Sequence, residues 1–201
     1  MNERFFELKK DKQDRMINAS LRVFSQYGYK HASTDEIVKE ARISKGLLFH
    51  YFESKIGLYS FLYDYSTRFI ALELTRNVEK SETGYFELYK QILAAKTASM
   101  SQYPYIFLFL KKVDAESDEE AVESVEERRD KYRGIMEALS ERADITIFQD
   151  GTDYMKVRDI LDFTVDGLIE RKARDENFRA DLFFEEACEY IDLIRKMTIK
   201  E

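Results

Sequence analysis

The chain has 201 residues, of which 44% are hydrophobic, 35% charged and 14% aromatic, a composition typical of a globular protein. One proline and seven glycines are too few for the many turns of an all-β fold. The net charge is −7, yet residues 1–60 carry 11 Lys and Arg against 8 Asp and Glu, which suits a chain that lays one end on phosphate but does not by itself establish DNA binding.

Apolar residues recur at helical spacing along almost the whole chain, which predicts an all-α fold of nine helices. Residues 1–10 are expected to form a frayed arm before the first helix. The helices are predicted at residues 11–27, 34–41, 45–49, 55–78, 84–103, 105–113, 117–139, 154–174 and 181–197. Residues 144–153 contain the one strand-like stretch, and because no second strand is available to pair with it, we expect a loop there. Gly28 can adopt the left-handed conformation that ends the first helix.

The last predicted helix, residues 181–197, is apolar over more than half of its circumference. A terminal helix of this kind packs on its own core with one side and needs a second surface for the other. A partner subunit is the simplest such surface, with residues 154–174 as the companion helix, so that two pairs form a four-helix seam. The alternative is a fully internal helix in a monomer.

Three predicted helices begin between residues 33 and 55, each directly behind a serine. Ser33 and Glu36 form a capping box, and Ser44 and Ser54 cap the next two helices. A helix N-terminus presents free N–H groups and partial positive charge, so it attracts phosphate. Two short helices joined by a tight turn, with a third directly behind, are typical of a helix-turn-helix whose second helix enters the major groove of DNA.

The predicted DNA-binding residues share this segment: Thr34, Arg42, Ser44, Lys45, Gly46, Leu47, Leu48, His50, Tyr51 and Lys55. Thr34 and Lys55 are expected to hold phosphates, which fixes register without reading sequence. Lys45 can donate to guanine and Leu47 can meet a thymine methyl group, while Gly46 permits close approach. Singly, these residues have ordinary explanations: a lysine can be solvated surface, and Leu48 or Phe49 can be core. The inference rests on the constellation.

Residues 10–60 resemble the DNA-binding domain of TetR-family transcriptional regulators. The matching positions are Thr34, Ile37, Ala41, Ile43, Ser44, Lys45, Gly46, Phe49, His50, Tyr51, Phe52, Ser54, Lys55 and Leu58, preceded by Phe24 to Tyr29. The resemblance implies a homodimer through helices 154–174 and 181–197, a pseudo-palindromic double-stranded DNA operator, and a small-molecule effector whose binding releases DNA. One position departs from the family: Arg42 replaces the usual glycine, and a left-handed backbone there costs arginine about 1 kcal/mol, which a phosphate contact can offset.

The body of the chain is rich in aromatic residues and holds neither histidine, since His31 and His50 both lie near the N-terminus. We therefore expect a mostly apolar effector pocket and no metal or cofactor. The predicted pocket residues are Tyr89, Leu93, Lys96, Phe107, Tyr132, Met136 and Phe163, each of which can also be plain core.

The single cysteine, Cys188, excludes an internal disulfide, and no apolar run approaches the length of a membrane span. The N-terminus lacks the apolar core of a secretory signal, so we expect a cytoplasmic protein with no membrane partner. Two domains are predicted: a helix-turn-helix domain at residues 1–54 and an effector-binding and dimerisation domain at residues 55–201.

The sequence therefore predicts a ligand-responsive, sequence-specific DNA-binding regulator, a repressor released from its operator by a small, mostly apolar effector. One alternative is a helical ligand-binding or adaptor protein that does not bind DNA. A second is an enzyme that uses Asp162 and Asp166, which share a helix face as a solvated acidic surface also would. The sequence contains no nucleophile–base arrangement and no phosphate-binding glycine loop, so no enzymatic activity is expected.

Overall fold

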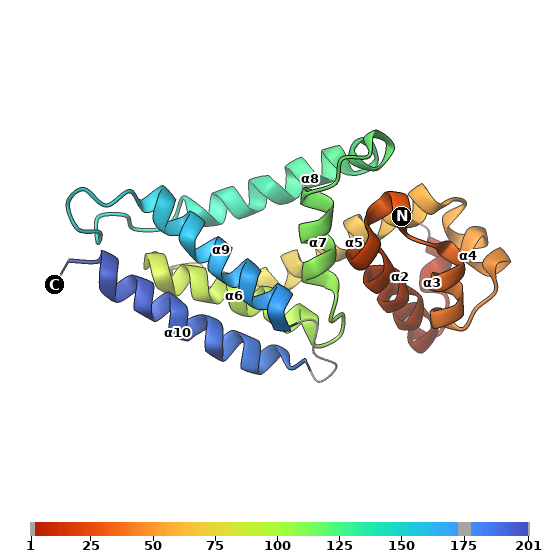
Figure 1. The fold of residues 1–201 in the computed structure, drawn as a ribbon, viewed down its shortest axis with the longest axis horizontal. Coiled ribbons are helices and arrows are strands. Elements are labelled where there is room, and N and C mark those ends of the chain that lie inside the picture. The colour runs from red at the N-terminus through yellow and green to blue at the C-terminus, as the bar shows by residue number, and fades with distance from the viewer. Residues whose placement is uncertain (1–2, 173–177, 201) are drawn as a thin grey trace. The chain divides into compact units, whose positions relative to one another are not determined.

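The computed structural model describes residues 3–172 and 178–200, and within them it contains ten helices and no strand (Figure 1). The helices are α1 (Glu3–Phe6), α2 (Lys10–His31), α3 (Thr34–Ala41), α4 (Lys45–Phe52), α5 (Lys55–Asn77), α6 (Tyr85–Met100), α7 (Ile106–Asp114), α8 (Glu119–Ser140), α9 (Tyr154–Lys172) and α10 (Ala180–Thr198). This confirms the all-α prediction. The tenth helix is the short α1, and residues 173 and 174, the predicted end of α9, lie outside the described residues.

Residues 144–153 form a loop, as predicted. A single antiparallel bridge nevertheless joins Phe148 to Ile199, next to a hydrogen bond from the Lys200 N–H to the Ile147 carbonyl at 3.0 Å. The strand-like stretch therefore does find a partner, at the C-terminal end of α10, although no strand forms.

Contacts divide the described chain into two units. The first consists of the described residues up to Ile70 together with Gln102–Arg133, and the second of Ala71–Ser101 together with the described residues from Gly134 onward. Helices α5 and α8 each have residues in both units. The predicted domain boundary after residue 54 falls inside the first unit and stays a prediction about function.

The N-terminal segment corrects the prediction of a frayed arm. Phe5 in α1 has no exposed surface, and its ring centroid lies 5.9 Å from that of Tyr51, 5.2 Å from that of Phe52 and 5.1 Å from that of Phe61. Full burial of such a side chain contributes about 1.5–3 kcal/mol, enough to dock a short helix whose flanking charges stay in water. Helical periodicity cannot detect this because α1 has only four residues, of which the adjacent Phe5 and Phe6 make the aromatic contacts.

Helix α2 contains a break at Gly28, one residue past its predicted end. Gly28 has φ 68° and ψ 179°, so the predicted positive φ is confirmed while ψ is extended rather than helical. A Cβ atom at this position would lie 3.2 Å from Cε of Lys112 and 3.3 Å from Oε2 of Glu116. The positive φ therefore favours glycine, while a Cβ atom would meet only the ends of two flexible side chains, which would have to move by a few tenths of an ångström.

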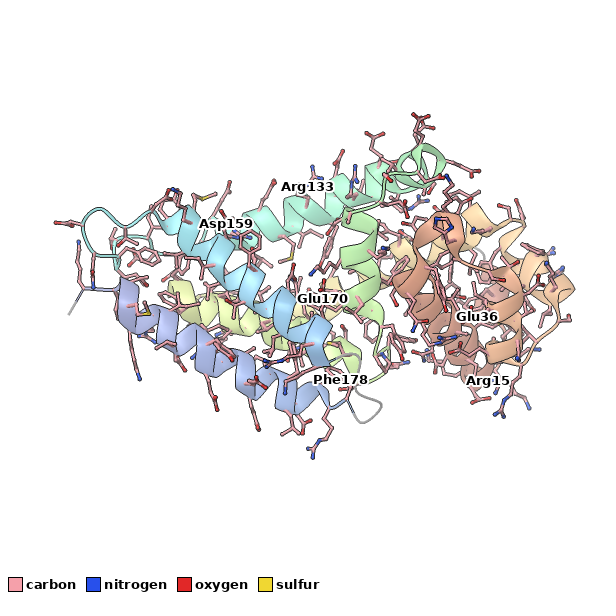
Figure 2. All side chains as sticks on the ribbon, viewed as in Figure 1. Arg15, Glu36, Arg133, Asp159, Glu170 and Phe178 are labelled. Atoms are coloured by element: carbon pink, nitrogen blue, oxygen red, sulfur yellow. The ribbon has the colours of Figure 1, made fainter. Side chains whose placement is uncertain are left out.

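The apolar faces of α2, α3 and α4 meet in one core. Its fully or almost fully buried residues are Met16, Ile17, Leu21, Phe24, Ile37, Ala41, Leu48 and Phe52. At the edge of this core, Arg22 of α2 holds two carboxylates of α3: it donates to Glu36 at 2.7 Å and to Glu40 at 2.6 Å. The hydrogen bonds from Arg22, foremost the one to Glu40, raise the pKa of its guanidinium, so the side chain stays charged and fixes α3 on α2. Figure 2 labels Glu36 among the side chains of the N-terminal helices.

In the second unit, α10 packs against both α6 and α9 (Figure 1). The buried residues at these contacts come from all three helices and include Phe86, Leu93, Leu161, Val165, Phe183, Ala187 and Ile191. Two ion pairs tie α6 to α10, Lys90 to Asp192 and Glu87 to Arg195, each at 2.5 Å. A hydrogen bond of 2.8 Å from the Tyr89 hydroxyl to Asp162 ties α6 to α9.

Candidate DNA-binding site

The start of α4 is built by Ser44. Its backbone is extended, with φ −82° and ψ 152°, and its hydroxyl accepts a hydrogen bond from the Leu47 N–H at 3.2 Å. Ser33 caps α3 in the same way, accepting from the Glu36 N–H at 3.4 Å. The capping box is incomplete because the Glu36 carboxylate is held by Arg22 instead of returning to the cap. Both predicted N-caps are confirmed, and each leaves first-turn N–H groups open to an anion.

The turn between α3 and α4 closes on Arg42. The Ile43 N–H donates to the Val38 carbonyl at 3.0 Å and the Arg42 N–H donates to the Lys39 carbonyl at 3.3 Å, which is the Schellman pattern. Arg42 is left-handed, with φ 55° and ψ 51°, as that pattern requires. Glycine usually occupies this position, so the arginine is strained by about 1 kcal/mol and presents an exposed guanidinium beside α4.

Two glycines near α4 have different reasons to be glycine. A Cβ atom on Gly57, in the first turn of α5, would lie 2.1 Å from the Phe52 carbonyl oxygen, so the close approach of backbones excludes any side chain. A Cβ atom on Gly46, in the first turn of α4, would have no heavy atom within 4 Å. Internal packing therefore explains the glycine at Gly57. It does not explain the glycine at Gly46, which weakens the helix although a side chain would fit there.

Lys45, the first residue of α4, forms an ion pair of 2.8 Å with Asp35 in the first turn of α3. The side chain of Lys45 is 50% exposed and that of Asp35 is 73% exposed, so water and salt weaken the pair. Thr34, which precedes Asp35, is partly exposed. Asp35 was not among the predicted site residues. The signal that could have indicated it is its place in the first turn of a helix, where acidic side chains are common.

Lys55, the first residue of α5, is less free than the sequence suggested. Its ammonium group donates to the Lys30 carbonyl at 3.2 Å and lies 4.7 Å from the ring centroid of Tyr29. The preceding Ser54 caps the helix by accepting from the Gly57 N–H at 3.1 Å, which confirms a third serine cap. Lys55 therefore stands at a helix N-terminus, as expected, with its charge already in contact with the end of α2.

The structure separates the remaining predicted residues by exposure. Leu48 has no exposed surface, which corrects its place among the base-contacting residues; it belongs to the core, on the side of α4 that is closed to solvent. Leu47 is partly exposed and His50 is exposed. Tyr51 is partly exposed, with its ring 5.0 Å from that of His50 and against Phe5. Nine of the ten predicted residues thus keep some accessible surface, and the DNA contacts themselves stay a prediction.

The predicted effector-pocket residues fall into both units. Phe107 and Tyr132 belong to the first, and Tyr89, Leu93, Lys96, Met136 and Phe163 belong to the second. Leu93 is buried, burial raises the pKa of the Tyr89 and Tyr132 hydroxyls, and Phe163 is 73% exposed. Such exposure fits a surface residue of α9 better than the wall of an enclosed pocket. A common cavity of these seven residues stays a prediction.

In the residues that the structure describes, no three His, Cys, Asp or Glu side chains lie where they could hold a metal ion. Across the same ranges, 3–172 and 178–200, every helix is too short or too polar to span a lipid bilayer.

Comparison with known proteins finds sequence similarity to regulators over part of the chain. Residues 16–60 match the family described as bacterial regulatory proteins, tetR family. The chain is 45% identical over 49 residues to the uncharacterized HTH-type transcriptional regulator YuxN of Bacillus subtilis, which is 24% of this chain and 17% of that protein. It is 33% identical over 58 residues to the A-factor receptor protein of Streptomyces griseus, 29% of this chain and 21% of that protein. The matched segment thus spans about a fifth of the length of these curated relatives.

The fold extends the likeness beyond the matched segment. A crystal structure of a TetR family transcriptional regulator from Chloroflexus aurantiacus J-10-FL aligns with a TM-score of 0.65 over 99% of this chain and 98% of that one, at 17% identity. Serine-capped α3 and α4, joined by a Schellman turn and followed by an all-helical body, define a helix-turn-helix protein. Residues 16–60 therefore match the tetR family of bacterial regulatory proteins, and the described chain shares its fold with a solved TetR-family regulator.

Proposed function

We propose that this protein is a dimeric, sequence-specific DNA-binding regulator, and a repressor that a small, mostly apolar effector releases from its operator. The observation that carries the proposal is the exposed N-terminus of α4, where Gly46 opens the first turn and Lys45 stands beside it. A helical glycine costs about 1 kcal/mol relative to alanine, and nothing inside the protein requires it here. Gly46 is explained if this surface must come within van der Waals distance of an external partner, because a side chain there would prevent close approach.

The proposed DNA contacts are of two kinds, to phosphates and to base edges. Open N–H groups at the starts of α3 and α5, with Thr34 and Lys55 beside them, suit phosphate oxygens, and the exposed Arg42 adds a charge at the turn. Lys45 and Leu47 lie on the first turn of α4, the part of a recognition helix that reaches base edges. Phosphate contacts supply affinity and register, and the first turn of α4 supplies sequence preference.

The dimer is proposed to form through α9 and α10. Leu182, Tyr190, Leu193 and Met197 are exposed on α10, and Ile160 and Phe163 are exposed on α9. The four α10 residues follow one another at spacings of eight, three and four residues, so they share one face of the helix. This face lies next to the one that is buried by Phe183, Ala187 and Ile191. Leu193 is 56% and Met197 is 69% exposed, and a helix with an unpartnered apolar face of this extent is stabilised by a second copy of itself.

The effector part of the proposal rests on the aromatic body and on the family. One matched relative is named as the receptor of A-factor, but the similarity is confined to 58 residues, so no ligand identity follows for this chain. The catalytic alternative has less support, because Asp162 already accepts a hydrogen bond from Tyr89 and pairs with Arg158 at 3.8 Å. We therefore place the function in binding rather than in catalysis.

Selection of bound fragments from a pool of random duplex DNA tests the proposal. The purified protein is expected to enrich one sequence with two inverted half-sites, and its affinity is expected to fall steeply with salt. Failure to retain any duplex at low salt would favour the adaptor alternative. Enrichment of a single half-site would keep DNA binding and contradict the dimer.

A further inference from the structure

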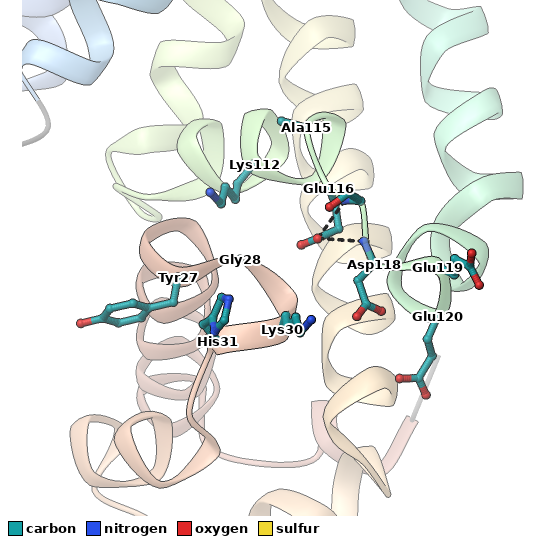
Figure 3. Close-up of a pocket in the computed structure, with 11 residues that line it drawn as sticks. Tyr27, Gly28, Lys30, His31, Lys112, Ala115, Glu116, Asp118, Glu119 and Glu120 are labelled. Atoms are coloured by element: carbon teal, nitrogen blue, oxygen red, sulfur yellow. Dashed lines mark hydrogen bonds between the residues drawn. The ribbon is translucent and has the colours of Figure 1, made fainter.

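The end of the loop between α7 and α8 and the first two residues of α8 form an acidic stretch, Glu116–Glu120, which we name the acidic loop. It contacts the end of α2 within the first unit. One carboxylate oxygen of Glu116 accepts from the Tyr29 N–H at 2.8 Å, and the other accepts from the N–H groups of Ser117 at 2.9 Å and Asp118 at 3.1 Å. Figure 3 shows these carboxylates beside the end of α2. Burial works to raise the pKa of Glu116, but the N–H donors outweigh it and hold that pKa below its usual value, so the carboxylate stays charged.

Tyr29 joins the acidic loop to Lys55. Its hydroxyl donates to Glu120 at 2.7 Å, and the face of its ring lies 4.7 Å below the Lys55 ammonium. Burial lowers the pKa of Lys55, while Asp118, Glu120 and Glu116 each act in the opposite direction, since negative charge stabilises the ammonium. The proposed phosphate-holding lysine therefore sits on an aromatic ring that is itself anchored to a carboxylate.

We propose that the acidic loop is an internal competitor of DNA, which holds Lys55 on Tyr29 by the same charge attraction that a DNA phosphate would use. The inference rests on the proposed function, because it assigns Lys55 a phosphate in the complex. When DNA binds, Lys55 gives up part of its interaction with the carboxylates, and these carboxylates also repel the incoming phosphates. The loop thus lowers DNA affinity through one identified lysine.

The surroundings allow this exchange without unfolding. A pocket of about 620 Å³ lies between the acidic loop and the end of α2, lined on the other side by Tyr27, Lys30, His31 and Lys112 (Figure 3). Solvent therefore reaches the loop, and its charges are screened as surface charges are. A single pair of this kind changes affinity by about twofold to fivefold. The loop joins α7 to α8, so a displacement of either helix would change the distance between the carboxylates and the Lys55 ammonium. An effector that moves one of these helices can therefore change DNA affinity through the loop.

Charge-neutral variants test the competition. Glu120→Gln keeps an acceptor for the Tyr29 hydroxyl, and Asp118→Asn keeps a cap for the Ala121 N–H, which Asp118 now accepts at 3.2 Å. Glu119→Gln is the matched control, because it changes the net charge equally in the same loop but is not among the carboxylates that act on Lys55. Each change is made in the full chain and again in a Lys55→Ala background, and binding to a random-sequence duplex is measured by fluorescence anisotropy, with thermal unfolding as a check on folding.

We expect Glu120→Gln and Asp118→Asn to tighten binding by about twofold to fivefold, Glu119→Gln to have a smaller effect, and the gain to disappear in the Lys55→Ala background. A gain that persists without Lys55, or an equal gain from Glu119→Gln, would reduce the effect to general charge and overturn the proposal. Weaker or unchanged binding by both variants would overturn it too. If the unmodified protein binds no duplex at low salt, it is the proposed function that fails, which separates the two results.

Discussion

Lys45 at the start of α4 and Asp35 in the first turn of α3 form an ion pair of 2.8 Å. Both side chains are at least half exposed, so the pair contributes no more than about 1 kcal/mol and can open when a stronger acceptor arrives. The pair crosses the tight turn and keeps the Lys45 ammonium beside the first turn of α4. A base edge placed there could accept a hydrogen bond from the Lys45 ammonium group without a large movement of the side chain.

Replacing Lys55 and replacing Lys45 are expected to change DNA binding in different ways. Lys55→Ala should weaken binding to every duplex and make the negative slope of log affinity against log salt shallower by about 0.9, because one phosphate contact is lost. Lys45→Ala and Leu47→Ala should instead change which sequence is preferred. Anisotropy titrations on the selected operator and on a scrambled duplex, each at several salt concentrations, measure both effects. Equal, sequence-independent losses from all three variants would contradict this division.

Arg42→Gly is expected to stabilise the fold and weaken DNA binding together. Glycine relieves the left-handed strain at φ 55° and should raise the free energy of unfolding by about 1 kcal/mol. Loss of the guanidinium should remove a phosphate contact. Urea unfolding and DNA titration of the same sample separate the two effects. Lys39→Gly, inside α3, is the matched control and should destabilise by about 1 kcal/mol, because its backbone is helical. If Arg42→Gly stabilises the fold and leaves DNA affinity unchanged, Arg42 does not contact DNA.

The N-terminal segment gives a test of core packing. Phe5→Ala should destabilise the protein by about 3–5 kcal/mol, because a fully buried ring against Tyr51, Phe52 and Phe61 is removed. Phe6→Ala, a change of the same chemistry at a side chain that is 39% exposed, should cost much less. Thermal unfolding measures both. Similar small effects would mean that α1 does not dock.

Sequence reasoning located the helix-turn-helix because its features are local. A serine three residues before the N–H it caps, as at Ser44 and Leu47, needs no knowledge of the rest of the chain. The apolar stripes of the long helices are local in the same sense, so most helix bounds fell within a few residues of the prediction.

What the sequence could not show depends on contacts between distant residues. Phe5 is buried only because α4 and α5 bring Phe52 and Phe61 to it. Leu48 and Phe49 were equivalent on the sequence, and only the direction of α4 decides that Leu48 is core. The link from Tyr29 to Glu116 spans 87 residues, and no periodicity predicts it.

The proposed dimer face predicts a change of oligomeric state. Leu193→Glu places a charge at the centre of the exposed apolar stripe of α10 and should yield monomers at micromolar concentration, because an uncompensated buried charge opposes association. Glu185→Lys, on the polar side of the same helix and about 100° around it from the centre of that stripe, should leave the dimer intact. Sedimentation velocity measures the mass. A monomeric unmodified protein, or a Leu193→Glu variant that remains dimeric, would contradict the assignment of this face.

The spacing between half-sites in the selected operator tests most directly whether two recognition helices enter successive major grooves. Inserting about five base pairs between the half-sites rotates one by half a turn and should reduce affinity to that of a single half-site. Unchanged affinity after this insertion would show that the two α4 helices of a dimer do not bind as a fixed pair, and would contradict the account.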